Sequence, residues 1–111
     1  MEYLPLFFDL KGQQVLLIGG GDIALRKGRL LTRAGARVRL VAPKIDPEVR
    51  ALIEASDGEL IESPYQVSHL QGVRLIVAAT DIDAVNRQVH ADAVAAGLPI
   101  NVVDNLSLIH I

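Results

Sequence analysis

The chain has 111 residues, enough for one domain with a hydrophobic core, and 50% of them are hydrophobic, yet no apolar run approaches the roughly 20 residues of a membrane-spanning helix. It contains no cysteine, which excludes disulfides and thiolate chemistry, and its amino terminus lacks a secretory pattern, so we expect a cytoplasmic protein. The net charge is -2 and aromatic residues are few, which argues against a nucleic-acid partner.

An apolar run at residues 15–18, without polar alternation, predicts a strand covered on both faces, as in a parallel sheet. Glycines end this run at once. Apolar residues at three- and four-residue spacing then predict a helix over residues 22–34, with Leu30 and Leu31 on its apolar face and Gly35 at its left-handed carboxyl-terminal cap. The pattern is strand, glycine turn and helix.

The middle of the chain repeats this pattern. Residues 38–41 predict a second strand, and Asp46 with the proline that follows predicts the amino-terminal cap of a helix that reaches about Ser56. A third, shorter strand is predicted at residues 59–62. The connection over residues 64–72 has room for at most one helical turn.

The last third adds two strands and a helix. Residues 75–79 predict a fourth buried strand, Thr80 and Asp81 are positioned to cap a helix that Gly97 ends, and residues 100–103 predict a fifth strand. Strands that alternate with helices indicate a parallel sheet with right-handed crossovers. We therefore expect an α/β fold, a Rossmann-type doubly wound parallel sheet of five strands in the order 3-2-1-4-5.

One domain over residues 1–104 accounts for these elements, because the sequence contains no internal repeat, low-complexity tract or linker. Residues 105–111 follow the fifth strand directly and stop before a further element is expected to form. We interpret them as a truncated or non-native tail.

Gly19, Gly20 and Gly21 form a turn whose spacing to Ala24 fits the G-x-G-x-x-A pattern of dinucleotide-binding proteins. Gly19 suits the tight turn, Gly21 allows a ligand to approach the backbone, and Ala24 suits close packing of helix on strand. A pyrophosphate is expected at the amino terminus of the helix, where unpaired N–H groups and the helix dipole favour an anion. Because the motif follows a predicted strand and opens a predicted helix, dinucleotide binding is favoured over a plain glycine turn.

The acidic residue that usually binds the adenosine ribose is missing at the end of the second strand, where residues 41–44 read Val-Ala-Pro-Lys. Contact with the ribose is then expected from backbone groups. Lys44 is compatible with a 2'-phosphate and hence with NADP, but a lysine in a loop is more often simply solvated. From the residues alone, the choice between NAD and NADP stays open.

Polar residues also follow the fourth and fifth strands. Because the carboxyl ends of parallel strands share an edge, Thr80, Asp81 and Asp104 are expected to border one crevice that receives the nicotinamide. Removal of a hydride from a saturated carbon releases a proton as well, and Asp104 is the candidate base. The alternatives are that Asp104 caps a turn and that Asp81 caps a helix. The three histidines have no spacing that predicts a metal site.

Four segments carry a family resemblance: Leu-Pro-Leu-Phe at residues 4–7, the glycine turn and helix within residues 15–33, Ala-Ala-Thr-Asp at 78–81 and Asn-Val-Val-Asp at 101–104. Together they resemble the precorrin-2 dehydrogenase/sirohydrochlorin ferrochelatase family, which includes the amino-terminal domain of siroheme synthase. The match is collinear over nearly the whole chain, and the combination is far more specific than the glycine motif alone.

The resemblance implies NAD-dependent oxidation of precorrin-2, a tetrapyrrole, to sirohydrochlorin in siroheme biosynthesis, followed in many family members by insertion of ferrous iron. By position, Asp104 matches the family's catalytic aspartate, and the pairs Asp22–Ile23 and Pro43–Lys44 match its cofactor contacts. With the residues at the strand ends, the predicted cofactor site comprises Gly19, Gly20, Gly21, Asp22, Ile23, Pro43, Lys44, Thr80, Asp81, Asn101 and Val102.

The chain departs from the family after Asp104. Family members continue, typically through a proline, into a helical dimerisation and tetrapyrrole-binding region, whereas residues 105–108 here read Asn-Leu-Ser-Leu. We therefore expect a truncated sheet domain, a homodimeric full-length form, and weak NAD binding with little turnover by this chain alone. Two rivals stay open: a non-catalytic module that senses NAD(H), and a Rossmann enzyme that uses S-adenosylmethionine.

Overall fold

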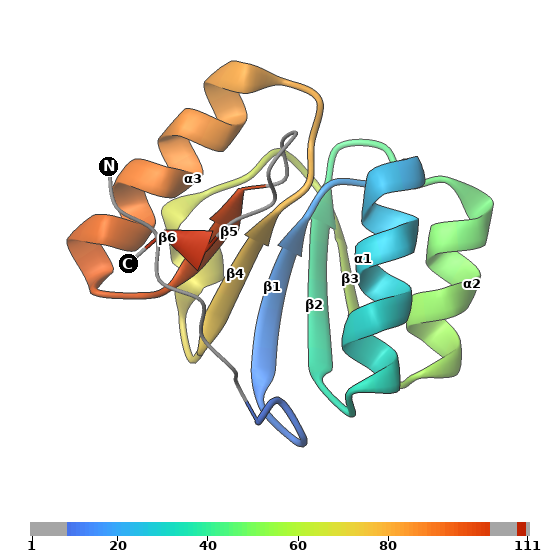
Figure 1. The fold of residues 1–111 in the computed structure, drawn as a ribbon. Coiled ribbons are helices and arrows are strands. Elements are labelled where there is room, and N and C mark those ends of the chain that lie inside the picture. The colour runs from blue at the N-terminus through green and yellow to red at the C-terminus, as the bar shows by residue number, and fades with distance from the viewer. Residues whose placement is uncertain (1–8, 103–108, 111) are drawn as a thin grey trace.

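The computed structural model describes residues 9–102 and 109–110, which form a mostly parallel sheet with helices on both faces (Figure 1). The parallel strands are β1 (Gln14–Ile18), β2 (Arg37–Ala42), β3 (Glu59–Glu62), β4 (Leu75–Ala78) and β5 (Ile100–Val102). They lie in the order β3-β2-β1-β4-β5, so the predicted doubly wound topology is confirmed. A two-residue strand, β6 (Ile109–His110), pairs antiparallel with β5, an addition that the sequence did not predict.

The middle strand β1 shows why its apolar run lacks alternation. Leu16 and Leu17 are both fully buried, but they belong to two different hydrophobic clusters, one on each face of the sheet. Leu17 packs in the cluster that includes Ile53, and Leu16 packs in the cluster that includes Val89. A strand with a core on each side has no position for a polar residue.

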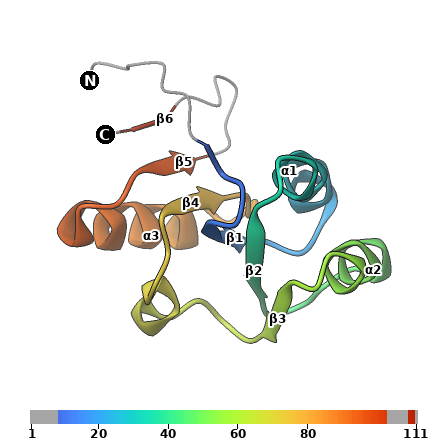
Figure 2. The same ribbon diagram turned by 90° about the horizontal axis from the view of Figure 1, so that it is seen from below.

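Helices α1 (Asp22–Arg33) and α2 (Pro47–Ala55) cover one face, while α3 (Asp83–Ala96) and the short 3-10 helix η1 (Val67–Leu70) cover the other, as Figure 2 shows. This 3-10 helix is the single turn expected between residues 64 and 72. No helix in residues 9–102 is both long enough and apolar enough to cross a lipid bilayer.

The predicted glycine ends of two helices are confirmed. After α1, Gly35 has φ +83°, and the N–H of Ala36 donates to the carbonyl of Leu31 at 3.1 Å. Gly97 ends α3 with φ +70°. Both backbone conformations lie in the left-handed region, which glycine adopts without the steric cost that a Cβ brings.

Two local predictions were wrong. Leu30 is 55% exposed, because the buried stripe of α1 runs through Ala24, Gly28 and Leu31 instead. At Gly28 a Cβ would lie only 3.1 Å from Leu52 Cδ2, so Gly28 is a position of close packing between α1 and α2, where an added methyl group would have to displace the end of Leu52. The spacing of apolar side chains did not reveal this stripe, because Gly28 has no side chain and yet occupies a buried packing position.

The start of α3 also differs from the prediction. The cap position is Ile82, not Asp81, and no side chain caps it. Thr80 closes the preceding turn instead, because its Oγ1 accepts a hydrogen bond from the N–H of Ile82 at 3.2 Å and its carbonyl accepts one from Asn86 at 2.9 Å. Asp81 is therefore exposed and takes no part in capping.

Candidate functional site

A cavity of about 580 Å³ lies at the carboxyl edge of the parallel strands, where the turns after β1, β2, β3 and β4 meet. This is the edge at which open parallel sheets bind their ligands. The predicted residues among its lining are Gly19, Gly20, Gly21, Pro43, Lys44, Thr80 and Asp81. Segments far apart in the sequence are thus brought to one hollow, as the topology required.

The glycine turn is fixed by its neighbours. Gly19 has φ +134°, and a Cβ there would lie 2.5 Å from the carbonyl oxygen of Ala79. A Cβ on Gly20 would overlap the carbonyl oxygen of Lys44. Neither position accepts a side chain, so the close packing of this turn on the ends of β2 and β4 explains the first two glycines.

The third glycine faces open space. A Cβ on Gly21 would meet only Asp46 Oδ2, at 4.0 Å. Gly21 is the amino-terminal cap of α1, and its carbonyl accepts the N–H of Leu25 at 2.9 Å. The earlier N–H groups of a helix have no partner within the helix, so the amides of Asp22 and Ile23 can bind an anion. Free space beside these amides fits the pyrophosphate of a dinucleotide.

Other predicted residues lie elsewhere. Asp22 is exposed beside a smaller hollow, and Ile23 packs against the core. On β5, Asn101 is buried and Val102 packs against the cluster beneath α3, so neither side chain is part of the cavity lining. Asp104 lies outside the described residues.

Three polar residues of the lining had not been predicted as part of the site: Asp46, Tyr65 and Gln88. Tyr65 follows β3 at the same edge of the sheet, and the rule that selected Thr80 after β4 would have selected Tyr65 as well. Its hydroxyl donates a hydrogen bond to Asp92 Oδ2 at 2.7 Å, and Gln88 Nε2 donates to Asp92 Oδ1 at 3.0 Å. The bond from Tyr65 joins the segment after β3 to α3, while the bond from Gln88 lies within α3 and fixes the same carboxylate.

Burial raises the pKa of the Tyr65 hydroxyl well above its usual value, and the hydrogen bond to Asp92 and the negative charge of Asp92 raise it further. The chain has two tyrosines, so in a Tyr3→Phe variant the phenolate absorbance reports Tyr65 alone. We expect its titration midpoint to lie clearly above the ordinary value of about 10. Asp92→Asn in the same background should lower the midpoint, but only in part, because burial is the larger cause.

The sign of the linkage follows from this shift. The folded state holds the Tyr65 proton more tightly than the unfolded state, so this contribution to stability is complete below pH of about 10 and declines as the pH rises further. A midpoint at the value of free tyrosine in Tyr3→Phe would contradict the burial of this hydroxyl.

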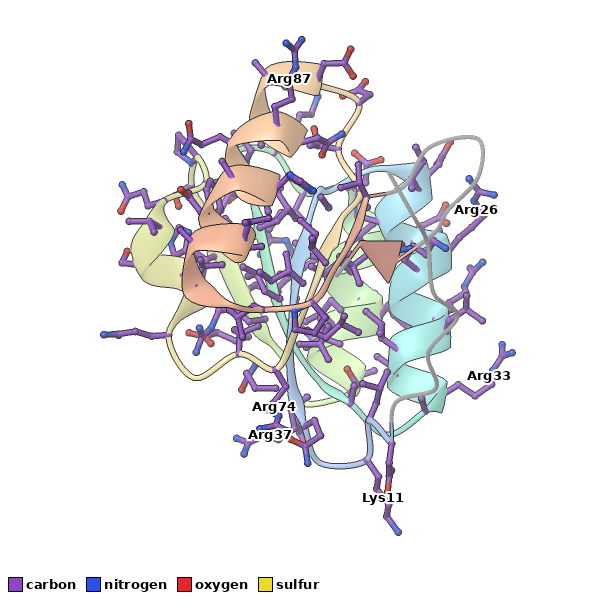
Figure 3. The ribbon with its side chains drawn as sticks, turned by 60° about the vertical axis from the view of Figure 1, so that its left-hand side comes forward. Lys11, Arg26, Arg33, Arg37, Arg74 and Arg87 are labelled. Carbon is purple, nitrogen blue, oxygen red and sulfur yellow. The ribbon has the colours of Figure 1, made fainter. Side chains whose placement is uncertain are left out.

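Basic side chains are mostly remote from the cavity. Lys11, Arg37 and Arg74 lie together at the amino ends of the strands, while Arg26 points away from α1 (Figure 3). Among the described residues that line the cavity, Lys44 is the only basic one. Attraction for a phosphate group therefore comes chiefly from the backbone amides and the helix dipole. Within residues 9–102, no three His, Asp or Glu side chains are grouped as metal ligands.

The parallel sheet, the constrained glycine turn and the open amino terminus of α1 define a Rossmann-type dinucleotide-binding domain. Residues 6–111 match the family described as putative NAD(P)-binding, and the chain belongs to this family. A nicotinamide dinucleotide is accordingly the class of cofactor for this fold.

Curated relatives extend the comparison. The chain is 52% identical over 108 residues to the siroheme synthase of Saccharophagus degradans, covering 97% of this chain and 24% of that protein. It is 53% identical over 104 residues to the siroheme synthase of Pseudomonas fluorescens (strain SBW25), covering 94% of this chain and 22% of that protein. The resemblance to the siroheme synthase family is confirmed, although the chain spans only about a quarter of the length of these relatives.

Solved structures agree with this placement. SirC, a precorrin-2 dehydrogenase, superposes with a TM-score of 0.71 at 28% identity, covering 95% of this chain and 47% of SirC. The apo-structure of D-lactate dehydrogenase from Escherichia coli superposes with a TM-score of 0.62 at 16% identity, over 90% of this chain and 33% of that chain. The second similarity shows a shared fold alone.

Proposed function

We propose that this chain is the cofactor-binding part of an NAD-dependent precorrin-2 dehydrogenase, which oxidises precorrin-2 to sirohydrochlorin in siroheme biosynthesis. The observation that carries the proposal is the cavity at the carboxyl edge, bordered by the glycine turn after β1 and by Thr80 and Asp81 after β4. The proposal is supported by the similarity of this chain to siroheme synthases, such as one with 52% sequence identity, and to the structure of the precorrin-2 dehydrogenase SirC.

The residues have separate roles in this proposal. The amides of Asp22 and Ile23 bind the pyrophosphate beside Gly21, while Pro43 and Lys44 contact the adenosine ribose through their backbone. Thr80 and Asp81 border the nicotinamide end, with Asn101 and Val102 supporting that edge from β5. When bound, NAD supplies the hydride acceptor, so the chain itself has to orient the two reactants and remove a proton.

Asp104 is the proposed base. It follows β5 by two residues, and the carboxyl ends of the parallel strands meet at the cavity edge. Oxidation of a saturated carbon transfers a hydride to the cofactor and releases one proton, which the carboxylate accepts. The tetrapyrrole carries many carboxylates, and the part of the cavity lining that the structure describes has Lys44 as its single basic residue. We therefore assign most of the tetrapyrrole-binding surface to the remainder of the full-length enzyme.

The test joins this chain through Asp104 to the remainder of the Saccharophagus degradans siroheme synthase and measures NADH formation with precorrin-2. We expect turnover, and a loss of about a hundredfold in Asp104→Ala, the size typical of a lost acid–base group. Glu54→Ala, which removes a carboxylate from an exposed position of α2, is the control and should retain activity.

The outcomes separate the proposal from its rivals. NADH binding without turnover would identify a nucleotide-sensing module, and full activity of Asp104→Ala would remove the proposed base. Calorimetric titration with S-adenosylmethionine and with NADH distinguishes a methyltransferase, which would bind the first and not the second.

A further inference from the structure

The side chain of Asp46 adds a carboxylate to the cavity lining, although the sequence predicted no acidic residue for the adenosine ribose. In Rossmann domains an acidic residue at the end of the second strand usually binds the adenosine ribose, and β2 here ends without one. Asp46 comes four residues after the end of β2, yet it lines the cavity, and its Oδ2 lies 4.0 Å from the position that a Cβ on Gly21 would occupy.

The backbone holds this carboxylate beside the glycine turn. The N–H of Asp46 donates to the carbonyl of Gly20 at 2.9 Å, and its own carbonyl accepts the N–H of Arg50 at 3.0 Å, the first bond of α2. Asp46 occupies the cap position of α2, but its side chain makes no capping hydrogen bond. The main chain is thus fixed at both its N–H and its carbonyl, while the carboxylate is left to face the cavity.

We propose that Asp46 binds the hydroxyls of the adenosine ribose and makes the site selective for NAD over NADP. This inference rests on the proposed function, since it presupposes that the cavity holds a nicotinamide dinucleotide. A carboxylate accepts hydrogen bonds from the 2'- and 3'-hydroxyls, whereas it repels a 2'-phosphate, which carries negative charge and has no hydroxyl to donate. In this proposal the acidic residue that binds the ribose is present, but it lies at the start of α2 instead of the end of β2.

Other acidic residues near Asp46 also disfavour the 2'-phosphate of NADP. A second hollow of about 200 Å³ shares Gly21 and Asp46 with the cavity and is also lined by Asp22 and Glu48. A phosphate displaced from Asp46 toward α2 would meet these two further carboxylates. Lys44 is the opposing charge, but its side chain is exposed to water, which weakens its attraction for a phosphate.

The test titrates this chain with NADH and with NADPH. We expect NADH to bind at least about tenfold more tightly, the size of one hydrogen bond to a charged group. Asp46→Asn keeps a good cap residue and removes the charge, so the fold should be retained while the preference for NADH shrinks by about tenfold. Glu54→Gln makes the same change of charge at an exposed position of α2 and should leave the preference unchanged.

Each outcome bears on a different claim. If NADH binds but Asp46→Asn and Glu54→Gln prefer NADH over NADPH to the same extent, the role of Asp46 is refuted while the dinucleotide site stands. The same conclusion follows if the unmodified chain prefers NADPH. If neither dinucleotide binds the unmodified chain, the proposed function itself fails and this inference with it.

Discussion

Gly20→Ala is expected to lower the free energy of unfolding by about 3 kcal/mol, the upper end of the usual cost of overpacking. The added methyl group would overlap the carbonyl oxygen of Lys44 and would lie 3.0 Å from the Cα of Ile45. Both are main-chain atoms, and the same segment is tied to the turn by the bond from Asp46 N–H to Gly20 O. The clash cannot be relieved by rotating a side chain. Urea unfolding followed by circular dichroism measures the loss.

Gly21→Ala is the matched control. Its methyl group would meet only Asp46 Oδ2, at 4.0 Å, so we expect a change in stability below about 1 kcal/mol. The same methyl group would occupy the space where the pyrophosphate approaches α1, and NADH affinity should fall by at least about tenfold. Equal stability losses in the two variants would show that the turn is not constrained as the structure has it.

The fold was predictable because its signals are local. Each buried strand is a short apolar run, and Gly35 and Gly97 mark helix ends where the backbone has positive φ. The order of the parallel strands then follows from general rules for crossover connections, which need no knowledge of individual contacts. The glycine turn was predictable for the same reason, since strand, turn and helix are adjacent in the chain.

The rest of the site depends on contacts between distant segments. The bond of Tyr65 to Asp92 spans 27 positions, and neither residue belongs to a motif. Asp46 was assigned only to a helix cap, because its position along the chain gives no indication that β2 and α2 turn it toward Gly21. Such residues are found by asking what lies beside the cavity, after the fold is known.

One further contact of this kind fixes the segment that carries Tyr65. Arg39 on β2 donates from Nη1 to the carbonyls of His69 and Gln71, each at 2.8 Å, and from Nε to Glu59 Oε1 at 2.8 Å. It therefore joins β2 to the edge strand β3 and to the segment around η1. The Arg39 side chain is only 19% exposed, and its hydrogen bond to the carbonyl of His69 is partly buried, whereas the bond to Gln71 lies at the surface.

Arg39→Met should lower the free energy of unfolding by about 3 kcal/mol, because methionine keeps most of the apolar length but leaves two carbonyls without their charged donor. The pair with half-exposed Glu59 contributes little of this loss. Hydrogen exchange should accelerate at residues 67–73 before it changes in β1. Since this segment continues from Tyr65, NADH affinity should fall as well, although Arg39 is not part of the cavity lining.

Arg50→Met separates this effect from a general loss of charge. Arg50 donates to Glu62 at 3.1 Å, but the two side chains are 40% and 52% exposed, and ion pairs of this kind contribute less than about 1 kcal/mol. The variant should unfold close to the midpoint of the unmodified chain and bind NADH equally well. If Arg39→Met behaved in the same way, the segment after β3 would be held by the packing of Leu70 against the core beneath α3, and the guanidinium bonds would be incidental to the shape of the cavity.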